Sequence, residues 1–200
     1  MYIGHVAIAL GSKGLWRDAP LWLLVVAAHS CDWVDAAMCG AGVEPNAMWS
    51  HSILAVAVIA VALALVARAS GSARTVAVVV AGTVASHLVV DYITGKKPTW
   101  PGGPAIGLNL YHHPGWEFVV EAVVITAGWL LYRGSLRPAE RTSRPAYLLL
   151  VVLLGLQFTA DAKVALKPSL SKCQWSVPPK VQTTANALPS IPLAGSKATE

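Results

Sequence analysis

Charged residues and cysteines are both scarce in this sequence. Asp, Glu, Lys and Arg make up only 12% of its 200 residues, about half the share usual in a soluble globular chain, and this scarcity excludes an ordinary water-soluble fold. The three cysteines include no Cys-x-x-Cys pair, so the sequence predicts neither a disulfide framework nor a thiolate metal site. The net charge of +5 does not indicate a nucleic-acid partner, because the basic residues lie in short segments between apolar runs.

The chain is rich in long apolar runs. Hydrophobic residues make up 55% of the sequence and the mean hydropathy is +0.56, values typical of an integral membrane protein. A helix needs about 20 residues to cross a bilayer, so residues 2–11 form a helix too short to span alone. We expect that short N-terminal helix to be followed by about five spanning helices, over residues 20–39, 51–68, 75–94, 116–132 and 146–163.

The predicted fold class is therefore all-α, a polytopic membrane helix bundle that occupies residues 1–166. Residues 167–200 are rich in Pro, Ser, Thr and Lys, and we expect them to form a disordered tail. No repeat of 20–50 residues is visible in the sequence, which argues against a stack of repeated units. The expected organisation is one membrane domain followed by a polar tail.

Lysine and arginine residues predict how the bundle is inserted. The N-terminal turn and the segments 68–74 and 133–144 together carry eight of them, against two in the loops 40–50 and 95–115. The positive-inside rule then places the first group in the cytoplasm and the second outside. With five spans the tail also lies outside, and its lysines are the main objection to this orientation.

The most informative stretch is residues 83–94, where two ionisable side chains interrupt an apolar run. His87 and Asp91 are four residues apart, so on a helix they project from the same face, one turn apart. An imidazole and a carboxylate at this spacing can share a proton or bind one metal ion. Ionisable groups inside a membrane span are costly and usually functional, so we interpret the pair as part of a site.

Other ionisable residues lie at the corresponding end of their own predicted spans. In an up-and-down bundle these ends all lie near one membrane surface, whichever way the protein is inserted. The sequence therefore predicts one polar layer with contributions from four helices. Besides His87 and Asp91, its members are Asp32 and Asp35 in the first span, His51 at the start of the second, and Glu117 and Glu121 at the start of the fourth.

His5 can join this layer if the short N-terminal helix folds back on the first span as a hairpin. A helix rises about 1.5 Å per residue, which would bring His5 close to the level of His29. His29 itself lies deepest in its span, and its simpler interpretation is a hydrogen bond between helices. His112 and His113 fall in a loop and are expected to be solvated. For three residues of the polar layer, a role in the site and simple solvation at the interface are equally open: His5, Asp35 and Glu117.

A set of several imidazoles and carboxylates suits a divalent cation. Zinc takes His nitrogen and carboxylate oxygen, with manganese, iron or a two-metal site as alternatives. A bound divalent cation lowers the pKa of water and so supplies a nucleophile near neutral pH. Carboxylates beyond those that hold the ion can serve as general base or orient the ligands, and Asp32 and Glu121 are our candidates for catalytic roles.

Several short motifs in this chain occur in a familiar order. They are Gly4-His5, Asp32 late in the first span, Trp-Ser-His-Ser at 49–52, and Ser86-His87-x-x-x-Asp91. In order and spacing they resemble the inner-membrane proteins classed as membrane-bound metal-dependent hydrolases, and the likeness covers about residues 1–132. The segment Gly107-Leu-Asn-Leu-Tyr111, followed by Glu121, is similar to small members of that kind. The resemblance implies an integral protein of a prokaryotic inner membrane with metal ligands at His5, Asp32, His51, His87 and Asp91.

The sequence departs from the pattern of the broader family at one point, and it also resembles a second kind of enzyme. The broader family often has Pro-Asp-x-Asp in the first span, whereas Asp32 and Asp35 here are three residues apart with no proline, which leaves the role of Asp35 open. The paired His and acidic residues are also similar to those of zinc-dependent phospholipase C, whose site is built on helices. That parallel implies phosphoester chemistry.

These observations leave three function classes open. The leading hypothesis is a metal-dependent hydrolase that acts on an amphiphilic substrate such as a lipid headgroup, most plausibly a phosphoester, with zinc as the metal. The second is a transporter in which the same groups relay protons or bind a cation. The third is a non-catalytic scaffold that uses the tail to bind a partner.

Overall fold

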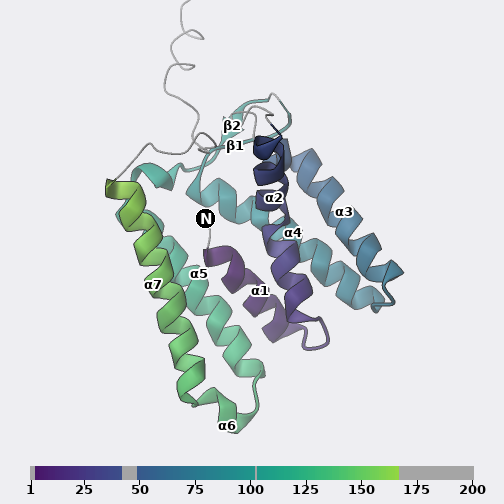
Figure 1. The fold of residues 1–200 in the computed structure, drawn as a ribbon, viewed down its shortest axis with the longest axis vertical. Helices are drawn as coiled ribbons and strands as arrows, with labels where there is room; N and C mark the ends of the chain where they lie inside the picture. Colours follow the sequence, from purple (N-terminus) through teal and green to yellow (C-terminus); the bar gives the residue numbers. More distant parts are fainter. Residues whose placement is uncertain (1–2, 42–48, 102, 167–200) are drawn as a thin grey trace, which may run out of the picture.

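The structure of the protein is a computed structural model that describes residues 3–41, 49–101 and 103–166. These residues form a bundle of helices with a small pair of strands at one end (Figure 1). In chain order the elements are α1 (Ile3–Leu15), α2 (Leu21–Gly40), the short 3-10 helix η2 (Trp49–His51), α3 (Ile53–Ala69), α4 (Arg74–Thr94), β1 (Lys97–Pro98), β2 (Ala105–Ile106), the 3-10 helix η3 (Leu110–His112), α5 (Pro114–Ser135), α6 (Pro138–Arg141) and α7 (Arg144–Leu166).

Four of these helices, α2, α4, α5 and α7, are long and apolar enough to cross a membrane. The apolar helix α3 has 17 residues, at the lower end of the range of about 17–25 residues for a spanning helix. All five predicted spans begin and end within three residues of these helices, so the prediction of an all-α membrane bundle is confirmed. The fourth span starts earlier than predicted because Pro114 begins α5, a position where the fixed φ of proline favours a helix.

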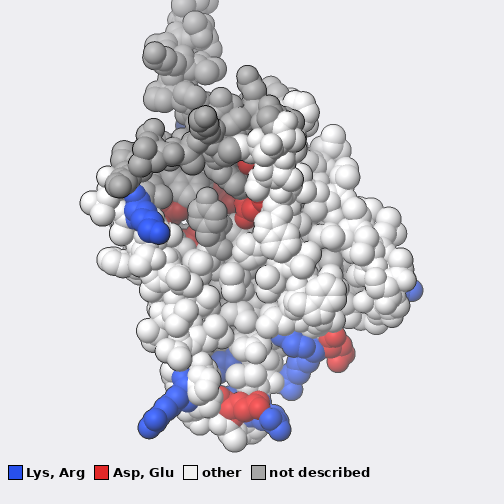
Figure 2. Space-filling view, viewed as in Figure 1, with Lys and Arg blue, Asp and Glu red and all other residues white. Residues whose placement is uncertain are grey.

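Successive long helices run in opposite directions, which brings the ends predicted to be polar together. The end of α2, the start of α3, the end of α4, the start of α5 and the strand pair all lie in the upper part of Figure 1. In Figure 2 the basic side chains gather mainly at the opposite, lower end, where acidic side chains are also visible, and further acidic side chains lie in the upper part between α2 and α7. The orientation stays a prediction, and it requires the enrichment of basic residues at the lower end.

The short helix α1 is buried in the bundle and packs closely against α5. A Cβ atom on Gly128 of α5 would lie 2.1 Å from the carbonyl oxygen of Ala7, and one on Gly14 would lie 2.4 Å from the backbone of Leu131. Contacts this short leave room for glycine alone, as at other close helix crossings between small residues. The crossing fixes the depth of α1, and therefore the depth of His5.

A serine side chain caps the start of α3. Ser52 is the residue whose side chain accepts the backbone N–H of Ala55 at 3.3 Å. Ser50 is unavailable for this role because its hydroxyl contacts His51 and Asp35 instead. His51 consequently lies in η2 and does not open α3.

The segment predicted as a loop between the third and fourth spans has a defined shape. β1 and β2 pair in antiparallel register, with Lys97 opposite Ile106. Gly107 has a φ of +136°, and a Cβ there would lie 1.9 Å from the carbonyl oxygen of Gly95, so the turn requires glycine. Tyr111, from η3, packs over Gly95. The result is a cap over the polar end of the bundle.

Two expectations concern residues near or beyond the edges of the bundle. The sequence predicts no disulfide framework, but Cys39 near the end of α2 is disulfide-bonded, so the expectation that the cysteines form no disulfide is wrong. Cys31 is a free, buried cysteine, as expected of a small apolar side chain. The predicted tail, residues 167–200, lies outside the described residues.

Candidate metal centre

α4 supplies the two residues around which the site is built. His87 and Asp91 are both buried, and the histidine Nε2 lies 3.3 Å from the aspartate Oδ2. The other ring nitrogen, Nδ1, lies 2.9 Å from the carbonyl oxygen of Ala28 on α2. A carbonyl can only accept a hydrogen bond, so Nδ1 carries the proton and the lone pair of Nε2 is directed toward Asp91. This is the form in which histidine binds a metal.

α2 and η2 bring two further groups to the same point. The Nε2 of His51 lies 3.3 Å from Oδ1 of Asp32 and 3.3 Å from Oδ2 of Asp91. Its Nδ1 lies 2.9 Å from the hydroxyl of Ser50, which in turn donates to Asp35 at 3.3 Å. Because the hydroxyl proton is used on Asp35, its oxygen accepts from Nδ1, and Nε2 again faces the site. Asp35 thus orients the imidazole from outside the cluster.

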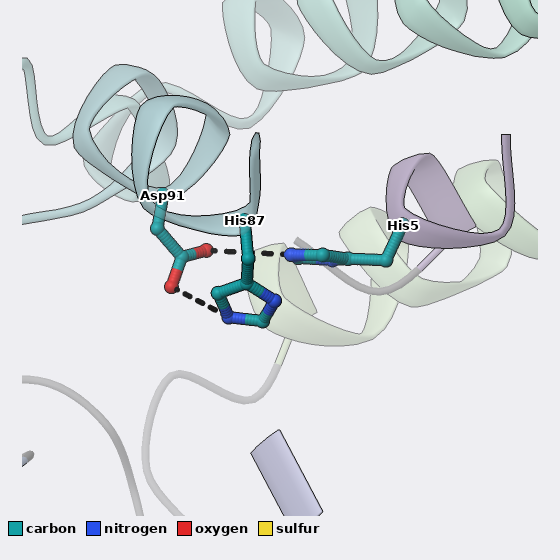
Figure 3. A group of neighbouring side chains, drawn as sticks. All are labelled: His5, His87 and Asp91. Carbon is teal, nitrogen blue, oxygen red and sulfur yellow. Dashed lines mark ion pairs between the residues drawn. The ribbon is translucent and has the colours of Figure 1, made fainter. Parts of the chain in front are cut away.

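His5 enters the cluster from α1. Its side chain is fully buried, its ring centroid lies 4.0 Å from that of His87, and its Nε2 lies 3.9 Å from Oδ1 of Asp91 (Figure 3). The hairpin geometry predicted for the N-terminal helix is therefore present. His29 lies further out, with its ring centroid 5.9 Å from that of His5.

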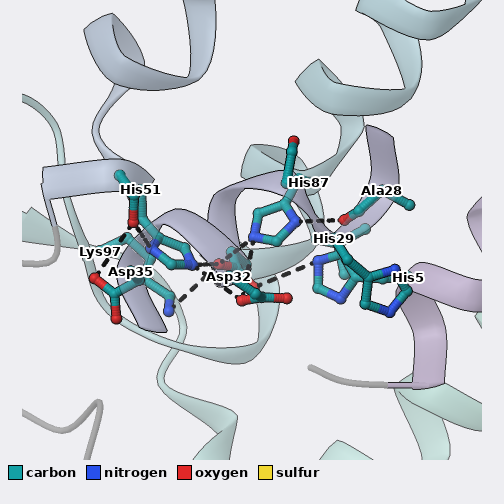
Figure 4. Close-up of polar contacts among 12 residues, drawn as sticks. His5, Ala28, His29, Asp32, Asp35, His51, His87 and Lys97 are labelled. Atoms are coloured by element: carbon teal, nitrogen blue, oxygen red, sulfur yellow. Dashed lines mark hydrogen bonds and ion pairs between the residues drawn. The ribbon is translucent and has the colours of Figure 1, made fainter. Parts of the chain in front are cut away.

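The side chains converge as two overlapping triads. His5, His87 and Asp91 each place a ligand atom within 4.8 Å of the others, and so do Asp32, His51 and His87. Figure 4 shows the side chains of His5, Asp32, His51 and His87 lying close together. The structure therefore gathers all five residues that the sequence singled out as metal ligands, although ligation itself stays a prediction.

The hydrogen-bonding state of the cluster fits a cation. Both ring nitrogens of His5, Nε2 of His87, and one oxygen each of Asp32 and Asp91 are buried without a hydrogen-bond partner. Polar atoms left in this state are costly, and most buried polar groups in proteins have a partner. Imidazole nitrogen and carboxylate oxygen are also the donors that zinc takes. The residues present thus suit a divalent ion shared between the two triads.

Lys97 is the site residue that sequence reasoning missed. Its side chain is almost fully buried, and its Nζ lies 3.3 Å from Oδ2 of Asp91. We counted it among the loop charges that set orientation, since nothing in a Lys-Lys-Pro loop segment marks one lysine as buried. The neighbouring Lys96 is exposed. Only the pairing of β1 with β2 turns Lys97 toward the cluster.

Tyr111 and Glu121 border the cluster without joining either triad. Burial raises the pKa of the Tyr111 hydroxyl well above its ordinary value, and this hydroxyl is hydrogen-bonded to Thr94. Glu121 is buried on α5 and accepts the backbone N–H of Gly4 at 2.9 Å. It therefore holds the first turn of α1, one residue before His5.

The remaining histidines lie outside both triads. His29 is half-buried, and its Nδ1 contacts the carbonyl oxygen of Val25 in its own helix at 3.0 Å. This is a bond within the helix where one between helices was expected. His112 and His113 are exposed. Glu117 is buried on α5, one turn before Glu121, so of the two alternatives left open for it, solvation at the interface is excluded.

We expect replacement of Ser50 by alanine to weaken metal binding about tenfold, the lower end of what loss of an outer hydrogen bond to a ligand histidine costs. The reason is that Nδ1 of His51 loses the hydroxyl that orients it. Titration of the metal-free protein with zinc measures the effect. Ser70→Ala, at an exposed position, is the matched control, and equal affinities for the two variants would contradict the prediction.

One of the comparisons with known proteins gives a match. No curated protein and no solved structure matches the chain. A sequence model of the family described as YdjM inner membrane protein matches residues 2–164. The chain belongs to the YdjM inner membrane protein family. The YdjM match covers every described helix but the end of α7, and with the apolar helices it identifies an integral inner-membrane protein. The YdjM description names a location and no reaction, so the chemistry of the site is argued from its residues.

Proposed function

We propose that this protein is a membrane-embedded metal-dependent hydrolase that acts on a phosphoester of an amphiphilic substrate, such as a lipid headgroup. The observation that carries the proposal is the convergence of three histidines and two aspartates from four separate elements, with buried ligand atoms that lack partners. His5, Asp32, His51, His87 and Asp91 would hold the ion, for which zinc is the best match.

A divalent ion in such a site supplies Lewis-acid activation of a phosphoryl oxygen and of water. The side chain of Asp32 is 14% exposed, against 2% or less for His51, His87 and Asp91, so it is the most accessible of these four side chains. Its Oδ2 is unpartnered while Oδ1 contacts both His51 and His87. Asp32 is therefore our candidate for the base that accepts a proton from the attacking water.

The substrate class follows from charge and position. Lys97 adds a buried cation beside the cluster, and a lysine ammonium is a common partner for phosphate oxygens. The cluster also lies at one end of the bundle, where the polar headgroups of a membrane begin. An anionic phosphoester at the membrane surface fits both features better than a neutral ester.

The direct test is hydrolysis by the purified full chain in lipid nanodiscs. We expect phosphate or phosphoalcohol release from a phospholipid substrate in the presence of zinc, and its loss after chelation and its return when zinc is restored. A metal-free sample that hydrolyses the lipid at the same rate would contradict the proposal. A preparation that binds zinc but releases no product from any phosphoester would restrict the site to a structural role.

We expect Lys97→Met to retain metal but to lower phosphoester turnover about 100-fold, the typical cost of removing one group that stabilises developing negative charge. The physical reason is that the ammonium lies beside the ligand Asp91 and would face the phosphoryl oxygens. Lys96→Met removes an exposed charge from the adjacent position and is the control. Equal turnover by the two variants would show that Lys97 takes no part in the proposed reaction.

A cation-coupled carrier is the second candidate, and position argues against it. Carriers place their site near the midplane, with access from both sides, whereas this cluster lies in the half of the bundle that holds the start of α1, the second halves of α2 and α4, and η2. Flux of a cation in proteoliposomes without turnover of any ester would favour the carrier. Retention of ester turnover without flux would exclude it.

A further inference from the structure

Cys39 lies at the polar end of the bundle, beyond the metal-site candidate. It is the second-last residue of α2 and is disulfide-bonded. It follows Asp35 by four residues and Asp32 by seven, spacings that place the three residues on one side of the helix. At a rise of about 1.5 Å per residue, Cys39 lies about 10 Å beyond Asp32 along the helix axis. No step of the proposed hydrolysis accounts for this disulfide.

The partner of Cys39 follows by elimination. The sequence holds three cysteines, and Cys31 is free and buried, which leaves Cys173 within this chain. Cys173 lies outside the described residues, seven positions after α7 ends at Leu166. Seven residues can span about 25 Å, roughly the combined diameter of two helices. Because α7 and α2 both end in the upper part of Figure 1, the chain is long enough to bring Cys173 to Cys39.

The disulfide indicates which compartment this end of the bundle faces. Disulfides persist in the bacterial periplasm and are rare in the reducing cytosol. Cys39 is only partly buried, so its sulfur is accessible to thiols and disulfides of the compartment that it faces. Because the chain is an integral inner-membrane protein, the oxidising side is the periplasm. The polar end of the bundle therefore faces the periplasm.

The distribution of basic residues points the same way on independent grounds. Arg17, Arg68, Arg74 and Arg133 lie in or beside the turns at the opposite end, and the positive-inside rule places that end in the cytoplasm. The lysines of residues 167–200 are the main objection to this orientation. A segment that is bonded to Cys39 lies on the same side of the membrane as the end of α2, so the disulfide answers that objection.

We propose that Cys39 pairs with Cys173, and that the polar end of the bundle, with the metal-site candidate, lies on the periplasmic side of the membrane. Formation of the bond removes two protons and two electrons from the two thiols, and the electrons reduce the disulfide of a periplasmic thiol–disulfide oxidoreductase. The substrate is then a lipid headgroup of the periplasmic leaflet. Only this last statement rests on the proposed function.

A count of free thiols tests the pairing. The full chain is denatured directly from membranes in the presence of a maleimide, and the labels on each chain are counted by mass spectrometry. We expect one label on the unaltered chain, none on Cys31→Ala, and two on Cys39→Ser and on Cys173→Ser. Cys31→Ala is the matched control, since it removes the thiol that stays unpaired. Two or three labels on the unaltered chain, or a single label on Cys173→Ser, would overturn the pairing. The unaltered chain carries no substitution, so its count is decisive even where a variant fails to fold.

Labelling from one side of the membrane tests the placement. A maleimide that cannot cross membranes is added to intact spheroplasts. One chain carries Cys31→Ala and Cys173→Ser, which leaves Cys39 as its one thiol. The control chain has all three cysteines replaced and carries Ser70→Cys, an exposed position in the turn after α3 at the opposite end. We expect the first chain to be labelled in intact spheroplasts and the control chain only after the membrane is made permeable. The reverse pattern, or no label on Cys39 before permeabilisation, would overturn the placement.

The outcomes also separate this inference from the proposed function. One free thiol per chain and labelling of Cys39 from outside, in a protein that hydrolyses no phosphoester, would support the disulfide and the placement and count against the hydrolase. Zinc-dependent hydrolysis in nanodiscs by a chain with three free thiols would support the hydrolase and overturn this inference.

Discussion

Replacement of Asp91 by asparagine is expected to abolish stoichiometric metal binding. The Asp91 carboxylate lies at the centre of the cluster, with Oδ2 at 3.3 Å from His51, His87 and Lys97 and Oδ1 at 3.9 Å from His5. Asparagine keeps the size of the side chain but removes its charge and one acceptor oxygen. Because changes even in groups that only orient ligands cost about 10–100-fold in metal affinity, loss of this carboxylate should cost at least about 100-fold.

Metal analysis of the purified variant measures this effect, together with a zinc titration of the metal-free protein. Asp18→Asn is the matched control, since it makes the same chemical change at an exposed position in the turn after α1. We expect Asp18→Asn to bind zinc as the unaltered chain does. An Asp91→Asn preparation that keeps one tightly bound zinc per chain would contradict the interpretation of the cluster as a metal site. It would leave the buried histidines and aspartates as a hydrogen-bonded structural network.

Replacement of Gly128 by alanine is expected to cause a large loss of stability. The added Cβ would lie 2.1 Å from the carbonyl oxygen and 2.7 Å from the carbonyl carbon of Ala7, and both are backbone atoms that no rotamer change can move. Either α1 shifts away from α5 or the clash remains, and overpacking of this kind costs about 1–3 kcal/mol. Because α1 carries His5, a shift would also move that imidazole away from Asp91.

Gly134→Ala is the control for this prediction, because it lies on the same helix and a Cβ there meets nothing within 4 Å. In a helix interior alanine is intrinsically better than glycine by about 1 kcal/mol, so Gly134→Ala should be neutral or stabilising. Thermal unfolding in one detergent, followed by circular dichroism, compares the two variants, and a zinc titration reports on His5. A Gly128→Ala protein as stable as Gly134→Ala would show that the crossing of α1 and α5 is looser than described.

Several features of the site could be read from helical periodicity and hydropathy. His87 and Asp91 share a face of α4 because residues four apart on any α-helix do so. Asp32, His51 and Glu121 reach the same end of the bundle because spans of similar length alternate in direction. His5 was predicted only as a geometric option, since it depended on how deeply a helix too short to span would enter the bundle.

Other features could not be read from one sequence. Lys97 lies in a loop, where no period relates a residue to a face, and the pairing of β1 with β2 decides that it is buried while Lys96 is exposed. Asp32 and Asp35 were both placed in the polar layer, but rotation of α2 directs the first into the cluster and the second to Ser50. For Glu117 the sequence left a role in the site and solvation at the interface equally open, and only the packing of the helices buries it outside both triads.

The sequence by itself determined the class of this protein, the number and extent of its long helices, and the end of the bundle at which ionisable groups collect. These follow from local rules, because the cost of burying polar groups in lipid and the rise of a helix apply to each segment separately. Only the tertiary structure decided which of those groups share a site. That depends on helix rotations, on the glycine contact between α1 and α5, and on the path of one loop, all of which are set by packing between segments distant in sequence.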